Sequence, residues 1–256
     1  MQNQFGSSLK HWRNQRRMSQ LGLGLTADVS ARHISFLETG RSRPSRAMVL
    51  HLCEQLDVPR AVRNKMLNQA GLAPAYESRP LAHEDMEPIR SAIDWMLERH
   101  NPYPAIALDR HWTIVDLNDS ANRLLGGMGL GEGMSVVQAL IDTPALQAAI
   151  TNLPEVVEHL RHRMRTESAH YGGDELLDAM ERELGGLADD EAREPGGILP
   201  AFVPTRYRFG ETELSLLSTF AQFGTAEDIA LGELRIEMMF PADEATRQTL
   251  LALTGS

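Results

Sequence analysis

Residues 19–45 place two short helices next to each other with only a tight turn between them, which constrains the fold more than any other stretch of the chain. Ser19 and Ser30 each stand where a side-chain hydroxyl can accept a hydrogen bond from the free N–H groups at a helix start. Asp28 lies between the helices and tolerates the left-handed backbone conformation of a tight turn. The stretch therefore predicts a helix, a turn and a second helix.

The second of these helices, at about 30–39, has a buried and an exposed face. Ile34 and Leu37 are three residues apart and are expected in the core, whereas Gly40 fits the position that ends a helix. Another face carries Ala31, Arg32, Ser35 and Phe36, and the cations Arg41, Arg43 and Arg46 follow at once. Positive charge beside an exposed helix suits contact with a phosphate backbone. The pattern predicts a DNA-binding helix-turn-helix.

Charge is divided unevenly along the chain. Residues 1–76 hold 11 Lys and Arg against 4 Asp and Glu, a net charge of +7, whereas residues 77–256 hold 14 against 31, a net charge of −17. The overall charge of −10 alone would argue against a nucleic-acid partner. Binding to DNA depends on local positive charge, however, so the division favours DNA binding by the first part.

The first part resembles the Xre-type helix-turn-helix family, which is related to phage repressors and Cro, over about residues 5–58. Its motif comprises Arg13, Gln20, Glu38, Gly40 and Pro44, with apolar residues at Leu9, Leu25, Val29, Ile34, Leu37, Val49 and Leu52. The resemblance implies that Gln20 contacts DNA phosphate and that Arg13 pairs with Glu38. It also implies that Ala31, Arg32 and Phe36 face base edges. The DNA-binding residues are expected to be Gln20, Ser30, Ala31, Arg32, Ser35, Phe36, Arg41, Arg43 and Arg46.

Two features depart from the family pattern. Gly22 and Gly24 lie inside the first helix of the pair, where each is expected to cost about 1 kcal/mol of helix stability relative to Ala. Asp28 replaces the usual turn glycine. Both changes bear on the stability of that helix more than on its identity.

The whole chain of 256 residues can hold one large or two ordinary domains. No run of about 18 apolar residues is present, and the N-terminus lacks the apolar core of a secretion signal. We therefore expect a cytoplasmic protein without a membrane segment. The single cysteine, Cys53, excludes an internal disulfide and is expected to be a small core residue.

Three regions are predicted along the chain. Residues 1–76 form an all-α domain of five helices, and 77–100 form a Pro-containing connector followed by a linker helix at about 85–99. Residues 101–256 carry strand-like runs at 105–108, 112–117, 205–209, 214–223 and 234–240, with helical stretches between them and a last short helix at about 243–254. This order predicts an α+β domain with an antiparallel sheet and helices across one face.

The last region resembles the PAS-like ligand-binding domain of the MmyB-like transcription regulators. The resemblance lies in 100–105 (HNPYPA), 108–112 (LDRHW), Asn118, 121–125 (ANRLL) and 199–243. It implies a ligand-responsive regulator, and a homologous domain in that family is associated with a fatty-acid-like ligand. A small apolar molecule of this class is therefore the expected ligand.

Aromatic and methionine side chains of the strand-like runs could surround such a ligand, since methionine walls suit flexible apolar molecules. The candidate wall residues are Trp112, Phe202, Phe220, Phe223, Met238 and Phe240. The alternative is that these residues simply fill an ordinary core. Arg163 and Arg165 are candidates to bind a carboxylate head group, because Arg–carboxylate pairs are strong.

Other kinds of site find little support. His159, His162 and His170 could meet at a metal, but the arginines between them oppose a divalent cation. The glycines at 126–133 lack a complete nucleotide-binding motif and follow a helix instead of a strand. No nucleophile with a paired base is visible, so neither an enzyme, nor a cofactor, nor a metal site is predicted.

The sequence thus predicts a sequence-specific DNA-binding regulator controlled by a small apolar ligand. It should act as a homodimer on a two-fold operator, since one recognition helix reads only a few base pairs. One alternative is a regulator whose C-terminal half is a protein-interaction or dimerisation module without a ligand. Another is an enzyme domain fused to a DNA-binding module.

Overall fold

The computed structural model describes residues 4–187, 202–224 and 227–254. The chain divides into two compact units, of which the first contains residues up to Ser78 and the second most of the remainder. Each unit is described by itself.

The N-terminal unit consists of five helices whose ends follow from local sequence. They are α1 (Gln4–Gln15), α2 (Gln20–Thr26), α3 (Ala31–Glu38), α4 (Arg46–Gln55) and α5 (Arg60–Gln69). Ser19, Ser30 and Ser45 cap α2, α3 and α4 by accepting hydrogen bonds from backbone N–H groups in the first turn of each helix. Asp28 forms the turn with a φ of 51°, and Gly40 ends α3 with a φ of 74°. The predicted helix-turn-helix is confirmed.

The core of this unit gathers apolar side chains from all five helices, among them Leu9, Leu23, Ile34, Leu37 and Leu52. One apolar residue of the motif, Leu25, is not part of this core, because 76% of its surface is exposed. It lies on the free face of α2, which needs no apolar residue for packing.

The two glycines of α2 also differ from each other. A Cβ atom on Gly24 would lie 2.5 Å from the carbonyl oxygen of Val29, closer than such atoms can approach. A Cβ on Gly22 would lie 3.3 Å from the Ser19 hydroxyl. The expectation that both glycines simply weaken the helix is therefore wrong for Gly24, because only glycine lets the backbone turn into α3 so tightly.

The C-terminal unit is built on a five-stranded antiparallel sheet. Its strands are β1 (Ala105–Leu108), β2 (Ile114–Leu117), β3 (Thr205–Phe209), β4 (Thr212–Gln222) and β5 (Arg235–Pro241), in the order β2-β1-β5-β4-β3. The strands alternate with or precede helices, so the predicted α+β class is confirmed. The second strand begins at Ile114 and not at residue 112, because the Asp109 carboxylate accepts hydrogen bonds from the His111 and Thr113 N–H groups and holds a turn there.

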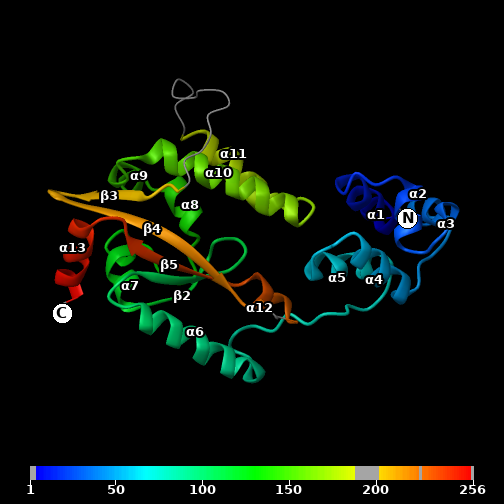
Figure 1. Ribbon diagram of the computed structural model, residues 1–256, viewed down its shortest axis with the longest axis horizontal. Helices are drawn as coiled ribbons and strands as arrows, with labels where there is room; N and C mark the ends of the chain where they lie inside the picture. Colours follow the sequence, from blue (N-terminus) through cyan, green and yellow to red (C-terminus); the bar gives the residue numbers. More distant parts are fainter. Residues whose placement is uncertain (1–3, 188–201, 225–226, 255–256) are drawn as a thin grey trace. The chain divides into compact units, whose positions relative to one another are not determined.

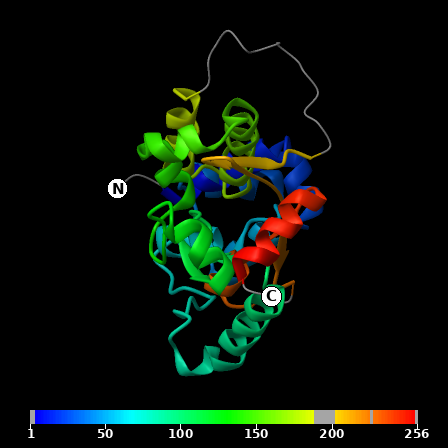
Figure 2. The same ribbon diagram turned by 90° about the vertical axis from the view of Figure 1, so that its left-hand side faces the viewer.

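Helices cover both faces of this sheet (Figure 1 and Figure 2). One side carries α7 (Asp119–Gly126), α8 (Val136–Asp142), α9 (Pro144–Ala149), α10 (Leu153–His170) and α11 (Glu175–Gly185). The other side carries α6 (Glu87–His100), preceded by a short 3₁₀ turn (Glu84–Met86). Two further helices, α12 (Ile229–Glu233) and α13 (Glu244–Thr254), flank β5. The expectation of helices across one face is thus incomplete, because the linker helix covers the second face.

The register decides which side chains enter which of the two cores. Within β5, Glu237 pairs with Ile106 of β1 and with Phe220 of β4, so these three share the face toward α7–α11, here called the inner face. Met238 is one residue further along and packs with Ile236 in the cluster that also holds residues of α6. The sheet therefore separates an inner core from an outer core.

Candidate functional site

The exposed face of α3 presents an aromatic ring between two cations. Ile34 and Leu37 are fully buried, which turns the opposite side of the helix outward. The guanidinium carbon of Arg32 lies 5.2 Å from the centre of the Phe36 ring, and that of Arg41 lies 5.9 Å from it. Arg32 and Arg41 are exposed and Phe36 is half-buried. These contacts hold two extended cations at the helix surface without using their hydrogen-bond donors.

A buried ion pair fixes α3 against α1. Arg13 donates from Nε to Oε1 of Glu38 at 2.6 Å and from Nη2 to Oε2 at 3.1 Å, in a two-point contact. The Gln20 amide donates to Oε2 of Glu38 at 2.8 Å. The pairing of Arg13 with Glu38 is confirmed. Gln20 lies at the same junction, and its side-chain amide has a second N–H donor in addition to the one in this bond.

The remaining predicted DNA-binding residues take different places. Ser30 caps α3 with its hydroxyl, Ala31 and Ser35 are half-buried, and Arg43 is exposed. Arg46 is exposed but donates to the carbonyl oxygens of Ala73 and Pro74, at 2.6 and 3.0 Å. The guanidinium of Arg46 therefore ties α4 to the segment that follows α5, a structural role that the sequence pattern did not indicate.

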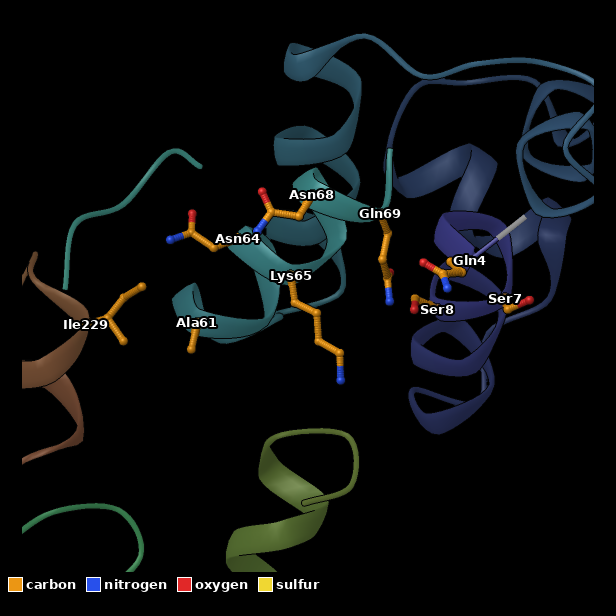
Figure 3. Close-up of a pocket in the computed structure, with 9 residues that line it drawn as sticks. All are labelled: Gln4, Ser7, Ser8, Ala61, Asn64, Lys65, Asn68, Gln69 and Ile229. Carbon is orange, nitrogen blue, oxygen red and sulfur yellow. The ribbon is translucent and has the colours of Figure 1, made fainter. Parts of the chain in front are cut away.

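A polar hollow lies beside α1 and α5 (Figure 3). It is lined by Gln4, Ser7, Ser8, Ala61, Asn64, Lys65, Asn68, Gln69 and Ile229. The Asn64 side chain already accepts from the N–H groups of Ala75 and Tyr76 and donates to the Tyr76 carbonyl. Its role is to hold the segment after α5, so the hollow shows no built ligand site.

A cavity of about 120 Å³ lies between the inner face of the sheet and the helices that cover it. Its wall is mostly apolar and is formed by Ile106, Trp112, Leu125, Met128, Leu130, Val136, Val137, Leu140, Leu146, Ile150, Val156, Leu160, Thr205, Tyr207, Glu237 and Met239. Polar groups in this wall come chiefly from Thr205 and Tyr207 of β3 and Glu237 of β5. An apolar cavity with a few polar groups is the usual form of a small-molecule site.

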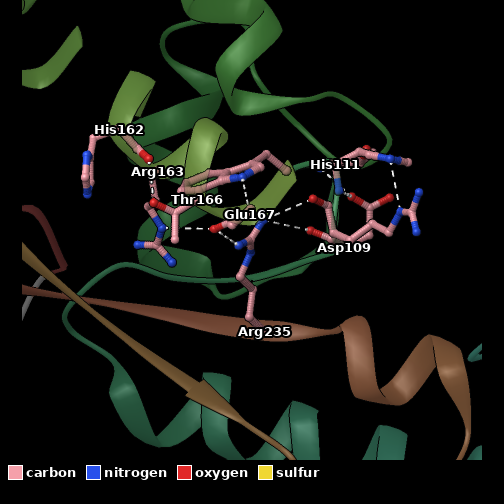
Figure 4. A network of polar contacts seen from close by, with 10 residues as sticks. Asp109, His111, His162, Arg163, Thr166, Glu167 and Arg235 are labelled. Carbon is pink, nitrogen blue, oxygen red and sulfur yellow. Dashed lines mark hydrogen bonds and ion pairs between the residues drawn. The ribbon is translucent and has the colours of Figure 1, made fainter. Parts of the chain in front are cut away.

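The carboxylate of Glu167 joins two arginines, Arg163 and Arg235 (Figure 4). Glu167 accepts from Nε1 of Trp112 at 3.1 Å, from Nη1 of Arg235 at 2.6 Å and from Nε of Arg163 at 3.1 Å. The Arg235 side chain is only 6% exposed. The Arg235–Glu167 ion pair is thus largely desolvated, and Glu167 neutralises the charge of Arg235, which would otherwise be buried alone.

The same two arginines stack on aromatic rings. The Arg163 guanidinium lies 3.8 Å from the centre of Phe220, and that of Arg235 lies 4.2 Å from the centre of Trp112. Trp112 and Phe220 meet edge to face at 5.9 Å. Trp112 itself lines the cavity, so this stack of rings and cations adjoins the cavity wall.

Three predicted ligand residues, Trp112, Arg163 and Phe220, therefore come together. Arg165 does not join them, since it binds Glu181 at 2.7 Å and is 56% exposed. Phe202 is 65% exposed. Met238, Phe223 and Phe240 also lie elsewhere: the first two pack in the outer core, and Phe240 contacts the His100 ring at the end of α6. The strand register turns Met238 and Phe240 away from the inner cavity.

The sequence patterns did not indicate four residues of this region: Glu167, Arg235, Glu237 and Tyr207. A signal was present in β5, where the charged residues Arg235 and Glu237 alternate with Ile236 and Met238. Such alternation indicates a strand face that carries polar groups. Its neighbours in the sheet, which bury that face, were not visible from the sequence.

A second pocket, of about 340 Å³, lies between α7, α13 and the turn that joins β3 to β4. It is lined by Pro102, Ser120, Arg123, Leu124, Gly127, Phe209, Thr212, Leu214, Thr249, Leu250 and Leu253. None of the predicted ligand-binding residues lines it. Arg123 donates to the Leu253 carbonyl at 3.3 Å, which closes one side of the pocket with a polar contact.

The histidines considered for a metal do not form a cluster of ligands. Burial, followed by the charge of Arg163 and by His162, lowers the pKa of His159. Within the described ranges, no group of three or more His, Cys, Asp or Glu side chains could hold a metal ion. The same residues include no helix that is long and apolar enough to cross a membrane.

Comparison with known proteins assigns both parts of the chain. Residues 4–66 match the model of a helix-turn-helix domain, and residues 89–253 match that of the MmyB-like transcription regulator ligand binding domain. One solved structure with similarity is the PAS domain of an HTR-like protein from Haloarcula marismortui, with 14% identity and a TM-score of 0.28 over 62% of this chain and 95% of that chain. No curated protein matches the chain. Because the second family model spans more than half of the chain, this protein belongs to the MmyB-like transcription regulators, with a helix-turn-helix domain followed by a ligand-binding domain.

Proposed function

We propose that this regulator reads a specific DNA sequence with α3 and changes its DNA binding when a small apolar ligand enters the C-terminal unit. The observation that carries the proposal is the outward position of Arg32 and Phe36 on a helix whose other face is fully buried. The net charge of +7 in residues 1–76 supports it, because phosphate contacts supply much of the affinity for DNA.

Arg32 and Phe36 have complementary roles in this proposal. An arginine can donate two hydrogen bonds to guanine in the major groove, and an apolar side chain can contact the thymine methyl group. The stacking of Arg32 on Phe36 orients the guanidinium before DNA arrives. Arg43, exposed beyond the end of α3, contacts the phosphate backbone and carries no sequence information.

Selection of a binding site from random DNA, followed by fluorescence anisotropy, tests these roles. Arg32→Ala and Phe36→Ala should each weaken operator binding by about 1–3 kcal/mol while binding to random DNA changes little. Arg43→Ala serves as the matched control and should weaken both kinds of DNA, with a salt slope lower by about 1. Equal loss on operator and random DNA in Arg32→Ala would overturn the base-reading role.

A single recognition helix reads too few base pairs to specify a site, so we infer that the protein binds as a homodimer. Two-fold symmetry of the dimer predicts an operator with two inverted half-sites about 10 base pairs apart. Sedimentation of the protein with operator DNA measures the stoichiometry. A single protein chain on an operator without inverted repeats would contradict the inference.

For the ligand, we propose a small apolar molecule such as a fatty acid, with a carboxylate at Arg163. Arg163 donates to Glu167 from Nε and stacks on Phe220, which leaves its guanidinium edge beside the cavity wall. Arg165 is the matched control, because it is bound to Glu181 and exposed. Arg163→Met should abolish ligand capture and Arg165→Met should leave it unchanged.

Native mass spectrometry of protein purified from cells provides the measurement. A retained apolar molecule that is lost in Arg163→Met supports sensing. An empty C-terminal unit in every preparation, together with unchanged operator binding after addition of a lipid extract, would instead favour an interaction module that has only a core.

A further inference from the structure

The wall of the inner cavity contains a carboxyl group that has no ion-pair partner among the described residues. Glu237 projects from β5, and Ser218 of β4 hydrogen-bonds to its side chain. Tyr207 projects from β3 into the same cavity, and its hydroxyl has no hydrogen-bond partner in the part of the chain that the structure describes. Both residues are half-buried, because they face the cavity. Glu237 and Tyr207 therefore keep hydrogen-bonding capacity inside a mostly apolar cavity.

The nearby cations do not use up this capacity. Arg163 and Arg235 both donate to Glu167, and they act on Glu237 only through their charge. Burial raises the pKa of Glu237, whereas the Ser218 hydrogen bond and the two arginines oppose that rise. Burial and the charge of Glu237 likewise raise the pKa of Tyr207, so its hydroxyl keeps its proton and can donate. The cavity wall thus offers an acceptor at Glu237 and a donor at Tyr207.

Different ligand ends fit this pair unequally. A methyl or ether end leaves the Glu237 carboxyl with the Ser218 hydroxyl as its donor and adds none, and buried acceptor capacity that is not used is unfavourable. A carboxylate end would place a second negative group beside Glu237. A hydroxyl satisfies both residues, since it can donate to Glu237 and accept from Tyr207.

We infer that the inner cavity takes the hydroxyl end of a small apolar alcohol or phenol, held by Glu237 and Tyr207. This inference rests on the proposed function, in which the C-terminal unit binds an apolar ligand, and it specifies which group enters the cavity. A carboxylate on the same ligand would remain outside, at Arg163.

The size of the cavity limits what enters. At about 120 Å³ it is somewhat smaller than an engineered cavity of about 150 Å³ that holds benzene, so it accepts about five non-hydrogen atoms. Suitable probes are 1-butanol and its isomer 1-methoxypropane, which has the same composition but no hydrogen-bond donor. Butanoate adds a charged end to the same chain length.

Methionine methyl NMR of the full chain reports binding at the cavity directly. Met128 and Met239 line the cavity, whereas Met66 is buried in the N-terminal unit and serves as the internal reference. 1-Butanol should shift the Met128 and Met239 signals saturably and bind about tenfold more tightly than 1-methoxypropane. Butanoate should bind more weakly than either, and Met66 should not respond.

Two variants assign the preference to Glu237. Glu237→Leu should abolish the tenfold preference for the alcohol, and Glu237→Gln, which keeps the shape, should reduce it and improve binding of butanoate. Glu213→Gln is the control, because Glu213 is an exposed carboxylate of the neighbouring strand and should leave the preference intact. The free-protein spectra show whether each variant retains the wild-type fold.

Equal affinity for the alcohol and the ether would overturn the inference while leaving ligand sensing intact. Absence of any shift with all three probes would mean that water alone fills the cavity, and would overturn it as well. The proposed function fails separately, if no apolar ligand is captured from cells and lipid extract leaves operator binding unchanged.

Discussion

The two units of this protein place their charged groups in opposite ways. In the N-terminal unit the buried charge is concentrated in the pair of Arg13 and Glu38, and the cations of α3 and the segment after it lie at the surface. In the C-terminal unit Arg235, Glu167 and Glu237 lie within or beside the inner core. The first arrangement leaves an apolar core, and the second places a few polar groups in the wall of a mostly apolar cavity.

The difference fits the function that we propose for each unit. DNA is a large polyanion, so the groups that bind it have to stand on a surface that the duplex can reach. A small apolar molecule is held by enclosure, so the groups that select it have to be inside. Exposed charged residues therefore indicate the binding surface of the N-terminal unit, and buried charged residues indicate the binding site of the C-terminal unit.

The largest expected effect tests the buried pair of the N-terminal unit. Glu38→Ala leaves the Arg13 guanidinium, whose side chain is 9% exposed, without its carboxylate. We expect a loss of about 3 kcal/mol in the free energy of unfolding of this unit. Urea unfolding with hydrogen exchange of the helix amides measures it. Glu54→Ala removes an exposed carboxylate of α4 and should change stability by less than about 0.5 kcal/mol.

A somewhat smaller loss is expected in the C-terminal unit. Glu167→Ala leaves Arg235 buried, but the Asp109 and Arg110 carbonyls, at 3.3 Å each, still accept from its Nη2. The expected loss is about 2 kcal/mol, measured by urea unfolding. Glu213→Ala, at an exposed pair, is the control. A loss as small as that of the control would show that the charges of this unit are not effectively buried, and the contrast between the units would fail.

A third pair of variants tests the close backbone contact between α2 and α3 in the N-terminal unit. Gly24→Ala forces a Cβ against the Val29 carbonyl and should cost about 1.5 kcal/mol. Gly22→Ala meets only the Ser19 hydroxyl at 3.3 Å, and the gain in helix propensity should leave stability within about 0.5 kcal/mol of the wild type or above it. Thermal unfolding of the two variants compares them. Equal effects would contradict the tight turn between α2 and α3.

The smallest effect concerns pH. Burial, together with Asp94 and Glu132, raises the pKa of Asp116 on β2. A raised pKa means that the folded state holds this proton more tightly, so the contribution to stability is present below the unfolded pKa of about 3.9 and is lost as pH rises through the folded value. Asp116→Asn should therefore match the wild type near pH 4 and be more stable by about 0.5 kcal/mol at pH 7. Urea unfolding at both pH values tests this, and a variant less stable at pH 7 would contradict the sign.

Much of the N-terminal unit was predictable because its signals are local. Three serines cap three helices, Asp28 and Gly40 mark the turns, and Ile34 and Leu37 follow helical spacing. Each of these preferences acts within a few residues of the chain. The place of Arg46, which binds the carbonyls of Ala73 and Pro74, depends on a contact distant in sequence and was not predictable.

In the C-terminal unit the sequence indicated the strands but not their faces. Trp112 and Arg163 were identified from residue type. Met238 was expected to line the cavity, but the pairing of β5 with β1 and β4 places Glu237 in the wall and Met238 in the outer core. A shift of one residue in that pairing would send the opposite set of side chains into the cavity.

The sequence by itself determined the helix-turn-helix, the uneven division of charge and the α+β order of the second unit, because helix caps, turns and periodicity are properties of neighbouring residues. Only the tertiary structure decided which strand face surrounds the cavity, that Glu167 joins Arg163 to Arg235, and that Gly24 is required by a backbone contact. The physical reason is that burial and strand register arise between segments far apart in the chain, where no local preference acts.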